Sequence, residues 1–121
     1  MEFDDKAPIY VQIMDLIKQR IASGELKVGE QLPSVRDLAG QLVVNPNTVQ
    51  KAYVELEREG YVDTQRGTGT FVLGDRGAVD QLRERLAHSA VESCVATLRS
   101  LGYSPDEIAA LAAQAAREVQ P

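Results

Sequence analysis

A nine-residue segment, 45–53, carries the side chains best suited to contact with another molecule. It contains no acidic residue and has the sequence Asn-Pro-Asn-Thr-Val-Gln-Lys-Ala-Tyr. Asn47 and Gln50 each offer a paired donor and acceptor, which matches the edge of an adenine base. Thr48 and Lys51 suit phosphate oxygens, as do the free N–H groups at the start of a helix. The segment therefore predicts contact with double-stranded DNA.

Two basic residues outside this segment lie where a DNA duplex would also meet the chain. Arg36 lies in the first turn of the preceding predicted helix, and Arg66 lies in the turn of a predicted hairpin. From there Arg66 could enter a minor groove or hold the DNA backbone. Each arginine taken alone is most simply a solvated surface charge. Their coincidence with the 45–53 segment, at three separate points of one fold, favours the DNA interpretation.

The overall charge of the chain does not by itself point to DNA. The 121 residues include 13 Lys and Arg against 18 Asp and Glu, which gives a net charge of −5, whereas DNA-binding domains are usually basic. A phosphate responds to charge within a Debye length of about 10 Å, so the acids must lie away from the contacting surface. Glu55, Glu57 and Glu59 do lie in the far half of their predicted helix. We expect Lys51 or Arg58 to compensate them at helical spacing.

Chemistry other than DNA binding finds little support in the sequence. His88 is the only histidine and Cys94 the only cysteine, and a spacing of six residues does not bring them to one face of a helix. Two such residues are too few for a zinc site, and no catalytic motif occurs, so we expect no metal, no cofactor and no enzymatic activity. A lone cysteine, with no signal peptide and no long apolar run, predicts a cytoplasmic protein that does not enter a membrane.

Apolar spacing and capping residues predict three helices before residue 60. Apolar residues recur at three- and four-residue steps over 8–23, which is typical of an amphipathic helix. Ser34, followed three residues later by an acid, is an N-cap signal for a short second helix. Asn45 followed by proline starts a third helix, which Gly60 ends.

A β-hairpin is predicted directly after the third helix. β-branched and aromatic residues over 61–65 and 70–73 are typical of strands, and the glycine-bearing residues 66–69 suit a tight turn between them. Two helices joined by a short turn and followed by such a hairpin have the pattern of a winged helix-turn-helix. The predicted fold class is therefore mostly α with a small β-hairpin, and residues 1–74 are expected to form a winged helix-turn-helix DNA-binding domain.

Residues 75–121 are predicted to form a two-helix C-terminal dimerisation tail. A long helix ends near Gly102, and Ser104 with Glu107 is a capping box that starts the last helix. So short a segment cannot bury a one-sided apolar face alone, so we expect it to pack against the tail of a second copy. The alternative is that the tail folds back over its own winged helix. The predicted dimer interface consists of Val79, Leu82, Leu86, Val91, Val95, Leu98, Ile108, Leu111, Ala112 and Ala115.

The sequence resembles the GntR family of bacterial regulators over residues 8–73. The strings that carry the resemblance run from Pro8 to Ile13, from Gly24 to Ala39, from Asn45 to Tyr53, from Leu56 to Gly60 and from Arg66 to Val72. The short tail is similar to that of the YtrA-type subfamily, because the large effector domains of other members need far more chain. The resemblance implies that Arg36 and the first turns of the third helix contact DNA. It also implies that Gly67 lets the hairpin turn approach the duplex closely.

Together these features predict a sequence-specific transcriptional regulator, most simply a repressor, that binds a palindromic DNA operator as a homodimer. The recognition helix, about 45–59, would lie in the major groove and the wing, 66–69, on the minor groove or the backbone. The alternative is a module that binds a protein partner with the same surface, which the acid-free segment argues against. A small-molecule effector, if there is one, would sit at the dimer interface or between tail and winged helix. The predicted DNA-contacting residues are Ser34, Arg36, Asn45, Pro46, Asn47, Thr48, Gln50, Lys51, Tyr53, Arg66, Gly67 and Thr68.

Overall fold

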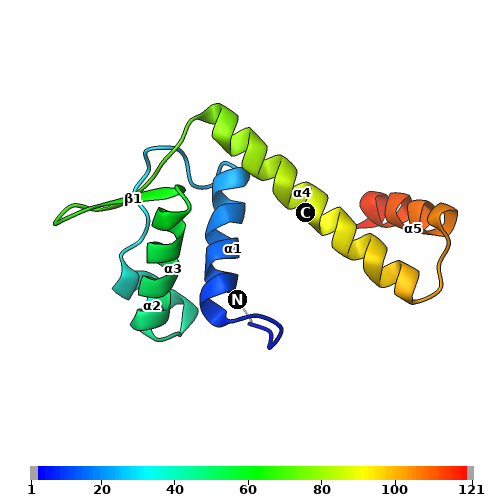
Figure 1. Ribbon diagram of the computed structural model, residues 1–121, viewed down its shortest axis with the longest axis horizontal. Helices are drawn as coiled ribbons and strands as arrows, with labels where there is room; N and C mark the ends of the chain where they lie inside the picture. The colour runs from blue at the N-terminus through cyan, green and yellow to red at the C-terminus, as the bar shows by residue number, and fades with distance from the viewer. Residues whose placement is uncertain (1–2, 120–121) are drawn as a thin grey trace. The chain divides into compact units, whose positions relative to one another are not determined.

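The computed structural model describes residues 3–119. Residues 1–2 of the first predicted domain and residues 120–121 of the predicted tail lie outside the described part. The elements in chain order are α1 (Ile9–Ala22), α2 (Val35–Leu42), α3 (Pro46–Arg58), β1 (Val62–Gln65), β2 (Gly69–Val72), α4 (Arg76–Ser100) and α5 (Pro105–Glu118) (Figure 1). The predicted fold class, mostly α with one small hairpin, is confirmed. The chain forms two compact units, one up to Arg83 and one from Glu84, so the division falls inside α4 rather than at residue 74.

Helix α3 is the central element of the first unit, because it packs against α1, α2 and β1. Four of its residues at helical spacing are buried, namely Val49, Ala52, Tyr53 and Leu56, and no charged residue is buried among residues 3–119. Each large side chain removed from water in this way stabilises the fold by about 1.5–3 kcal/mol. The core of the unit consists of Ile13, Met14, Ile17, Ile21, Leu26, Leu32, Leu38, Ala39, Val49, Ala52, Tyr53, Leu56, Val62, Val72 and Leu82.

The starts of α2 and α3 are fixed by the capping residues that the sequence predicted. The Oγ of Ser34 accepts a hydrogen bond from the backbone N–H of Asp37, at 3.0 Å. The Oδ1 of Asn45 accepts one from the backbone N–H of Asn47, at 2.8 Å. Each cap satisfies a backbone donor that the first turn of a helix leaves unpaired. Asn45 therefore fixes the end of the short turn between the two helices, and Ser34 fixes the start of the helix pair.

The wing is more than a two-stranded hairpin. Strands β1 and β2 pair antiparallel, with Val62 opposite Val72, and the hairpin projects beyond the helices of its unit (Figure 1). Residues 29–32, part of the connector between α1 and α2, lie along the other edge of β2. The N–H of Leu32 donates to the carbonyl of Thr70 at 2.8 Å, and Gln31 forms an isolated bridge with Phe71. The connector therefore anchors one side of the hairpin.

The second unit is a helical hairpin made of the last part of α4 and of α5. The predicted capping box starts α5: the Oγ of Ser104 accepts from the N–H of Glu107 at 3.2 Å, and Glu107 accepts from the N–H of Ser104 at 2.9 Å. These hydrogen bonds from Ser104 lower the pKa of the Glu107 carboxyl. From Glu84 to residue 119 only Ile108 is fully buried, so the described part of this unit has almost no core of its own.

Candidate nucleic-acid interface

The first half of α3 presents an exposed, acid-free polar face. Val49 and Ala52 point into the core, and this turns Asn47, Gln50 and Lys51 outward, where all three are exposed. The side-chain amides of Asn47 and Gln50 make no hydrogen bond with residues 3–119, so both remain open to pair with another molecule. Thr48 is half-buried beside them, and Pro46 is exposed at the first helical position.

Lys51 is held in place by an aromatic residue of α1. Its Nζ lies 4.2 Å from the centre of the Tyr10 ring, within the range of a cation–π interaction. Tyr10 is half-buried, so its ring is a fixed surface on which the exposed lysine rests. Tyr10 was not among the predicted site residues, because the contact joins two helices and no local spacing indicates it.

Tyr53 does not lie on the exposed face, contrary to the prediction that it contacts DNA. Its side chain is 3% exposed, and its hydroxyl donates a hydrogen bond to the backbone carbonyl of Pro33 at 2.7 Å. Burial raises the pKa of this hydroxyl, with a smaller opposing effect from Arg20. Because Pro33 immediately precedes the cap of α2, Tyr53 fastens α3 to the start of the neighbouring helix. It is a positioning residue for the surface.

Arg36 and Ser34 lie at the start of α2. Both residues are exposed, and the side chain of Ser34 is engaged as the N-cap. Arg36 forms no ion pair with any residue from 3 to 119, so its charge is not neutralised within the described protein. Its guanidinium is available to an external anion, for which the five N–H donors of arginine are well suited.

The turn of the wing carries three of the predicted residues. Arg66, Gly67 and Thr68 are all exposed, and the N–H of Thr68 donates to the carbonyl of Gln65 at 2.9 Å to close the turn. Gly67 has φ +79°, a left-handed conformation that a residue with a side chain rarely adopts. The glycine is therefore required by the turn itself, and it also leaves the backbone beside Arg66 open to close approach.

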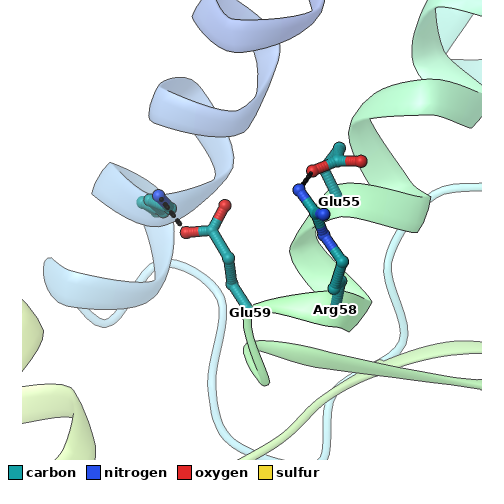
Figure 2. Close-up of polar contacts among 4 residues, drawn as sticks. Glu55, Arg58 and Glu59 are labelled. Atoms are coloured by element: carbon teal, nitrogen blue, oxygen red, sulfur yellow. Dashed lines mark hydrogen bonds and ion pairs between the residues drawn. The ribbon is translucent and has the colours of Figure 1, made fainter.

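The acids of α3 are engaged away from this face. Arg58 pairs with Glu55 along the helix, and Lys18 of α1 pairs with Glu59 at 3.0 Å (Figure 2). The carboxylate of Glu57 accepts the backbone N–H of Thr64 in β1, at 2.6 Å. Arg58 thus provides the predicted compensation, whereas Lys51 interacts with Tyr10 instead. The carboxylates of α3 and its C-cap thus contact other groups of the protein, and they lie in the half of the helix far from Asn47 and Gln50.

The ten residues of the predicted dimer interface fall into two groups. Leu82 is 2% exposed and belongs to the first unit with half-buried Val79, and Ile108 is buried in the second unit. Leu82 is therefore a core residue of the first unit and offers little surface to a partner, which corrects the prediction for it, whereas Ile108 still lines an open groove of the second unit. The other residues of the predicted interface remain exposed or half-buried in the second unit: Leu86, Val91, Val95, Leu98, Leu111, Ala112 and Ala115.

An open apolar groove of about 490 Å³ runs between the two helices of the second unit. Its lining residues come from both α4 and α5, and all but one are apolar: Val91, Val95, Arg99, Pro105, Ile108, Ala109 and Ala112. Val91 at its rim is 59% exposed. The second unit therefore presents an apolar surface that its own described residues leave uncovered.

Within residues 3–119, no group of three or more His, Cys, Asp or Glu side chains lies close enough together to hold a metal ion. No helix in the same part of the chain is long and apolar enough to cross a membrane.

A helix pair with α3 as its second member, followed by a hairpin with an exposed arginine, defines a winged helix-turn-helix DNA-binding domain. Residues 9–72 match the family described as bacterial regulatory proteins, gntR family, and the chain belongs to that family. Members of this family are transcriptional regulators and not enzymes, and this chain is such a regulator.

Known relatives and a solved structure are similar to this protein over most of its chain. The sequence is 43% identical over 107 residues, covering 88% of each chain, to the uncharacterized HTH-type transcriptional regulator YhcF of Bacillus subtilis. It is 41% identical over 92 residues, 71% of each chain, to the HTH-type transcriptional repressor YtrA of the same organism. A GntR family transcriptional regulator from Listeria monocytogenes shares 38% identity with a TM-score of 0.82, over 93% of this chain and 98% of that one.

A protein solved in complex with DNA is also similar to part of this chain. The DNA-binding domain of AraR, solved in complex with operator ORX1, has a TM-score of 0.56 and 28% identity, over 59% of this chain and 92% of that one.

Proposed function

We propose that this regulator represses transcription by binding a palindromic operator as a homodimer. The first turns of α3 lie in the major groove, and Arg36 and the wing hold the flanking backbone. The observation that carries the proposal is the acid-free face of α3, where the amides of Asn47 and Gln50 have no partner within residues 3–119. An amide paired with an adenine edge is the usual way for such residues to read sequence.

The charge distribution supports the same docking. A net charge of −5 would repel DNA if the acids faced it, but the carboxylates of Glu55, Glu57 and Glu59 are engaged by other groups of the protein. Arg36 and Arg66 remain exposed on either side of α3 in the sequence, in α2 and in the wing. Cations there neutralise phosphates and fix the register of the helix, while the amides supply the base preference.

The apolar surface of the second unit supports the homodimer. Nearly all of its valine, leucine and alanine side chains remain in contact with water in the single chain, and pairing with an identical tail would remove them from it. A two-fold pair would then present two α3 helices about 34–36 Å apart, which is one turn of DNA. Repression is supported by the relative YtrA, which is described as a repressor.

Selection of bound duplexes from a random DNA pool by the full chain tests the proposal. We expect a two-fold symmetric motif with half-sites about one turn apart. Asn47→Ala or Gln50→Ala should relax the preference at one base position per half-site, at a cost of about 1–3 kcal/mol. Gln19→Ala, which removes an exposed amide from α1 outside the proposed contact surface, is the matched control and should leave the motif unchanged. A pool without enrichment would contradict sequence-specific binding and favour a protein partner for this surface.

A further inference from the structure

Resting on the proposed function, we infer that Gln31 is a positioning residue for DNA binding. It lies in the connector between α1 and α2 and holds the wing turn that carries Arg66. Its side chain does not contact the DNA in this proposal. It restricts the positions that Arg66 can adopt, and it thereby increases the contribution of this arginine to the affinity for DNA.

The side chain of Gln31 reaches the wing turn directly. Its Nε2 donates a hydrogen bond to the carbonyl of Thr68 at 3.0 Å, across 37 residues of sequence. Thr68 in turn closes the turn by donating its N–H to Gln65, at 2.9 Å. The amide of Gln31 therefore holds the turn two residues after Arg66, at the peptide group that joins Thr68 to Gly69.

The backbone of the connector is fixed on both sides of Gln31. Gln31 bridges Phe71, the N–H of Leu32 donates to Thr70 at 2.8 Å, and the N–H of Gly29 donates to Val72 at 2.9 Å. Two strands of four residues make a hairpin that is only marginally stable alone. The connector contacts the free edge of β2, and the Gln31 side chain extends these contacts beyond the start of β2 to Thr68 in the turn.

Gly69 makes room for the glutamine. A Cβ on this residue would collide with the Nε2 of Gln31, and its φ of +139° already disfavours any residue with a side chain. The absence of a side chain at this one position lets the amide pass against the turn. Sequence and geometry on both sides of the contact thus fit one arrangement, in which the turn rests on Gln31.

A wing turn that is ordered before binding should bind DNA more tightly than a loosely held one. An arginine on a loosely held turn must lose conformational freedom when it meets a phosphate or a minor groove, and this weakens binding. A turn that Gln31 already holds loses less conformational freedom on binding, so the cost to binding is smaller. The same connector continues into the Ser34 cap and Arg36, so the glutamine also ties the wing to the start of α2.

The test is a double-mutant cycle in the full chain, read out by affinity for the duplex selected from the random pool. Gln31→Met keeps the length of the side chain and its neutral charge but removes the donor. We expect it to weaken binding by about three- to tenfold, and Arg66→Ala to cost less in its presence than in the wild-type chain. Gln19→Met, on an exposed glutamine of α1 whose side chain makes no hydrogen bond with residues 3–119, should have no effect.

Hydrogen exchange of the free protein gives a second measurement that needs no DNA. Gln31→Met should speed exchange of the Thr68 amide while leaving the buried amides of α3 unchanged, whereas a loss of overall fold would speed both. Unchanged Thr68 exchange, or losses from Gln31→Met and Arg66→Ala that simply multiply, would overturn the inference alone. A wild-type chain that selects no duplex would instead overturn the proposed function, and this inference with it.

Discussion

At the scale of single residues, exposure separates side chains that can meet DNA from those that hold the surface in shape. Asn47, Gln50 and Arg36 are exposed, and none of their side chains is paired within residues 3–119. The side chains of Tyr53 and Gln31 instead donate hydrogen bonds to backbone carbonyls of the protein. A substitution in the first group should change recognition, and a substitution in the second should act through the position of its neighbours.

The two exposed arginines yield a prediction about salt dependence. Arg36→Ala and Arg66→Ala should each weaken binding to all duplexes by a similar factor and reduce the slope of log affinity against log salt by about one. The reason is that each lost cation releases about one counterion fewer from the duplex. Titrations at several salt concentrations measure the slope, with exposed Arg83→Ala on α4 as the control. A slope that both variants leave unchanged would exclude phosphate contact by these residues.

Tyr53 yields a prediction about alkaline stability. Burial raises the pKa of its hydroxyl in the folded protein, whereas in the unfolded chain the group ionises near pH 10. Above about pH 10 the unfolded state therefore loses a proton that the folded state keeps, so the free energy of unfolding falls as pH rises. This contribution is fully present below pH 10 and is lost between the ordinary pKa and the raised one.

Denaturant unfolding of Tyr53→Phe tests this assignment. The variant loses the bond to the Pro33 carbonyl, so near neutral pH its free energy of unfolding should be about 1 kcal/mol lower. Its decline above pH 10 should be shallower than that of the wild type, because the titrating group is gone. The variant Tyr103→Phe, on an exposed tyrosine, should follow the wild-type profile. Parallel alkaline declines for wild type and Tyr53→Phe would show that this hydroxyl does not control the profile.

At the scale of elements, the turn between α2 and α3 sets the angle at which α3 is presented. Val43 ends α2 with φ +55° and ψ +54°, a left-handed conformation that is costly for a β-branched residue. It is 88% exposed, so its side chain gains no burial in return. The conformation is maintained by the elements on either side, which the caps and the core hold in place.

Relief of this strain should stabilise the protein. Val43→Gly should raise the free energy of unfolding by about 0.5–1 kcal/mol, since the gain in the left-handed region exceeds the entropy lost by the freer glycine chain. Val43→Asn should also stabilise, because asparagine tolerates this region. Thermal unfolding measures both, and Val54→Gly, inside α3, is the control that should destabilise. A lower melting temperature for both Val43 variants would refute the strain argument.

At the scale of the whole molecule, the proposed homodimer depends on the uncovered surface of the second unit. From Glu84 to residue 119 the chain buries only Ile108, while Val91 and Leu111 at the proposed interface are 59% and 40% exposed. A helical hairpin with so little core of its own gains stability by pairing. Dimerisation would also join two DNA-binding units, which raises affinity for a two-part operator without any new contact to a base.

A charge placed in this surface should separate the two copies. Val91→Glu should shift the mass measured by light scattering from dimer to monomer, because pairing would bury an unpaired carboxylate. Affinity for the two-part operator should then fall roughly a hundredfold, with the half-site preference retained. Val28→Glu replaces a comparably exposed valine in the first unit and should remain dimeric. A monomeric wild-type chain at the concentrations that bind DNA would rule out the proposed dimer.

The amino-acid sequence by itself determined the order and type of the elements and the residues at their ends. Caps such as Ser34, Asn45 and the Ser104–Glu107 pair act over three residues, so their signal is local and the structure confirms it. The exposed face of α3 followed for the same reason, because helical spacing decides which side chains share a face with the buried Val49.

Only the tertiary structure decided which polar side chains are already engaged. Tyr53 bonds to a carbonyl twenty residues away, Lys51 rests on Tyr10 of another helix, and Gln31 holds a turn that lies 37 residues further along the chain. It also placed Leu82 in the core, where the sequence had assigned it to an interface. Such contacts depend on how separate elements pack, and periodicity within one element shows that a side chain faces inward without showing what it meets there.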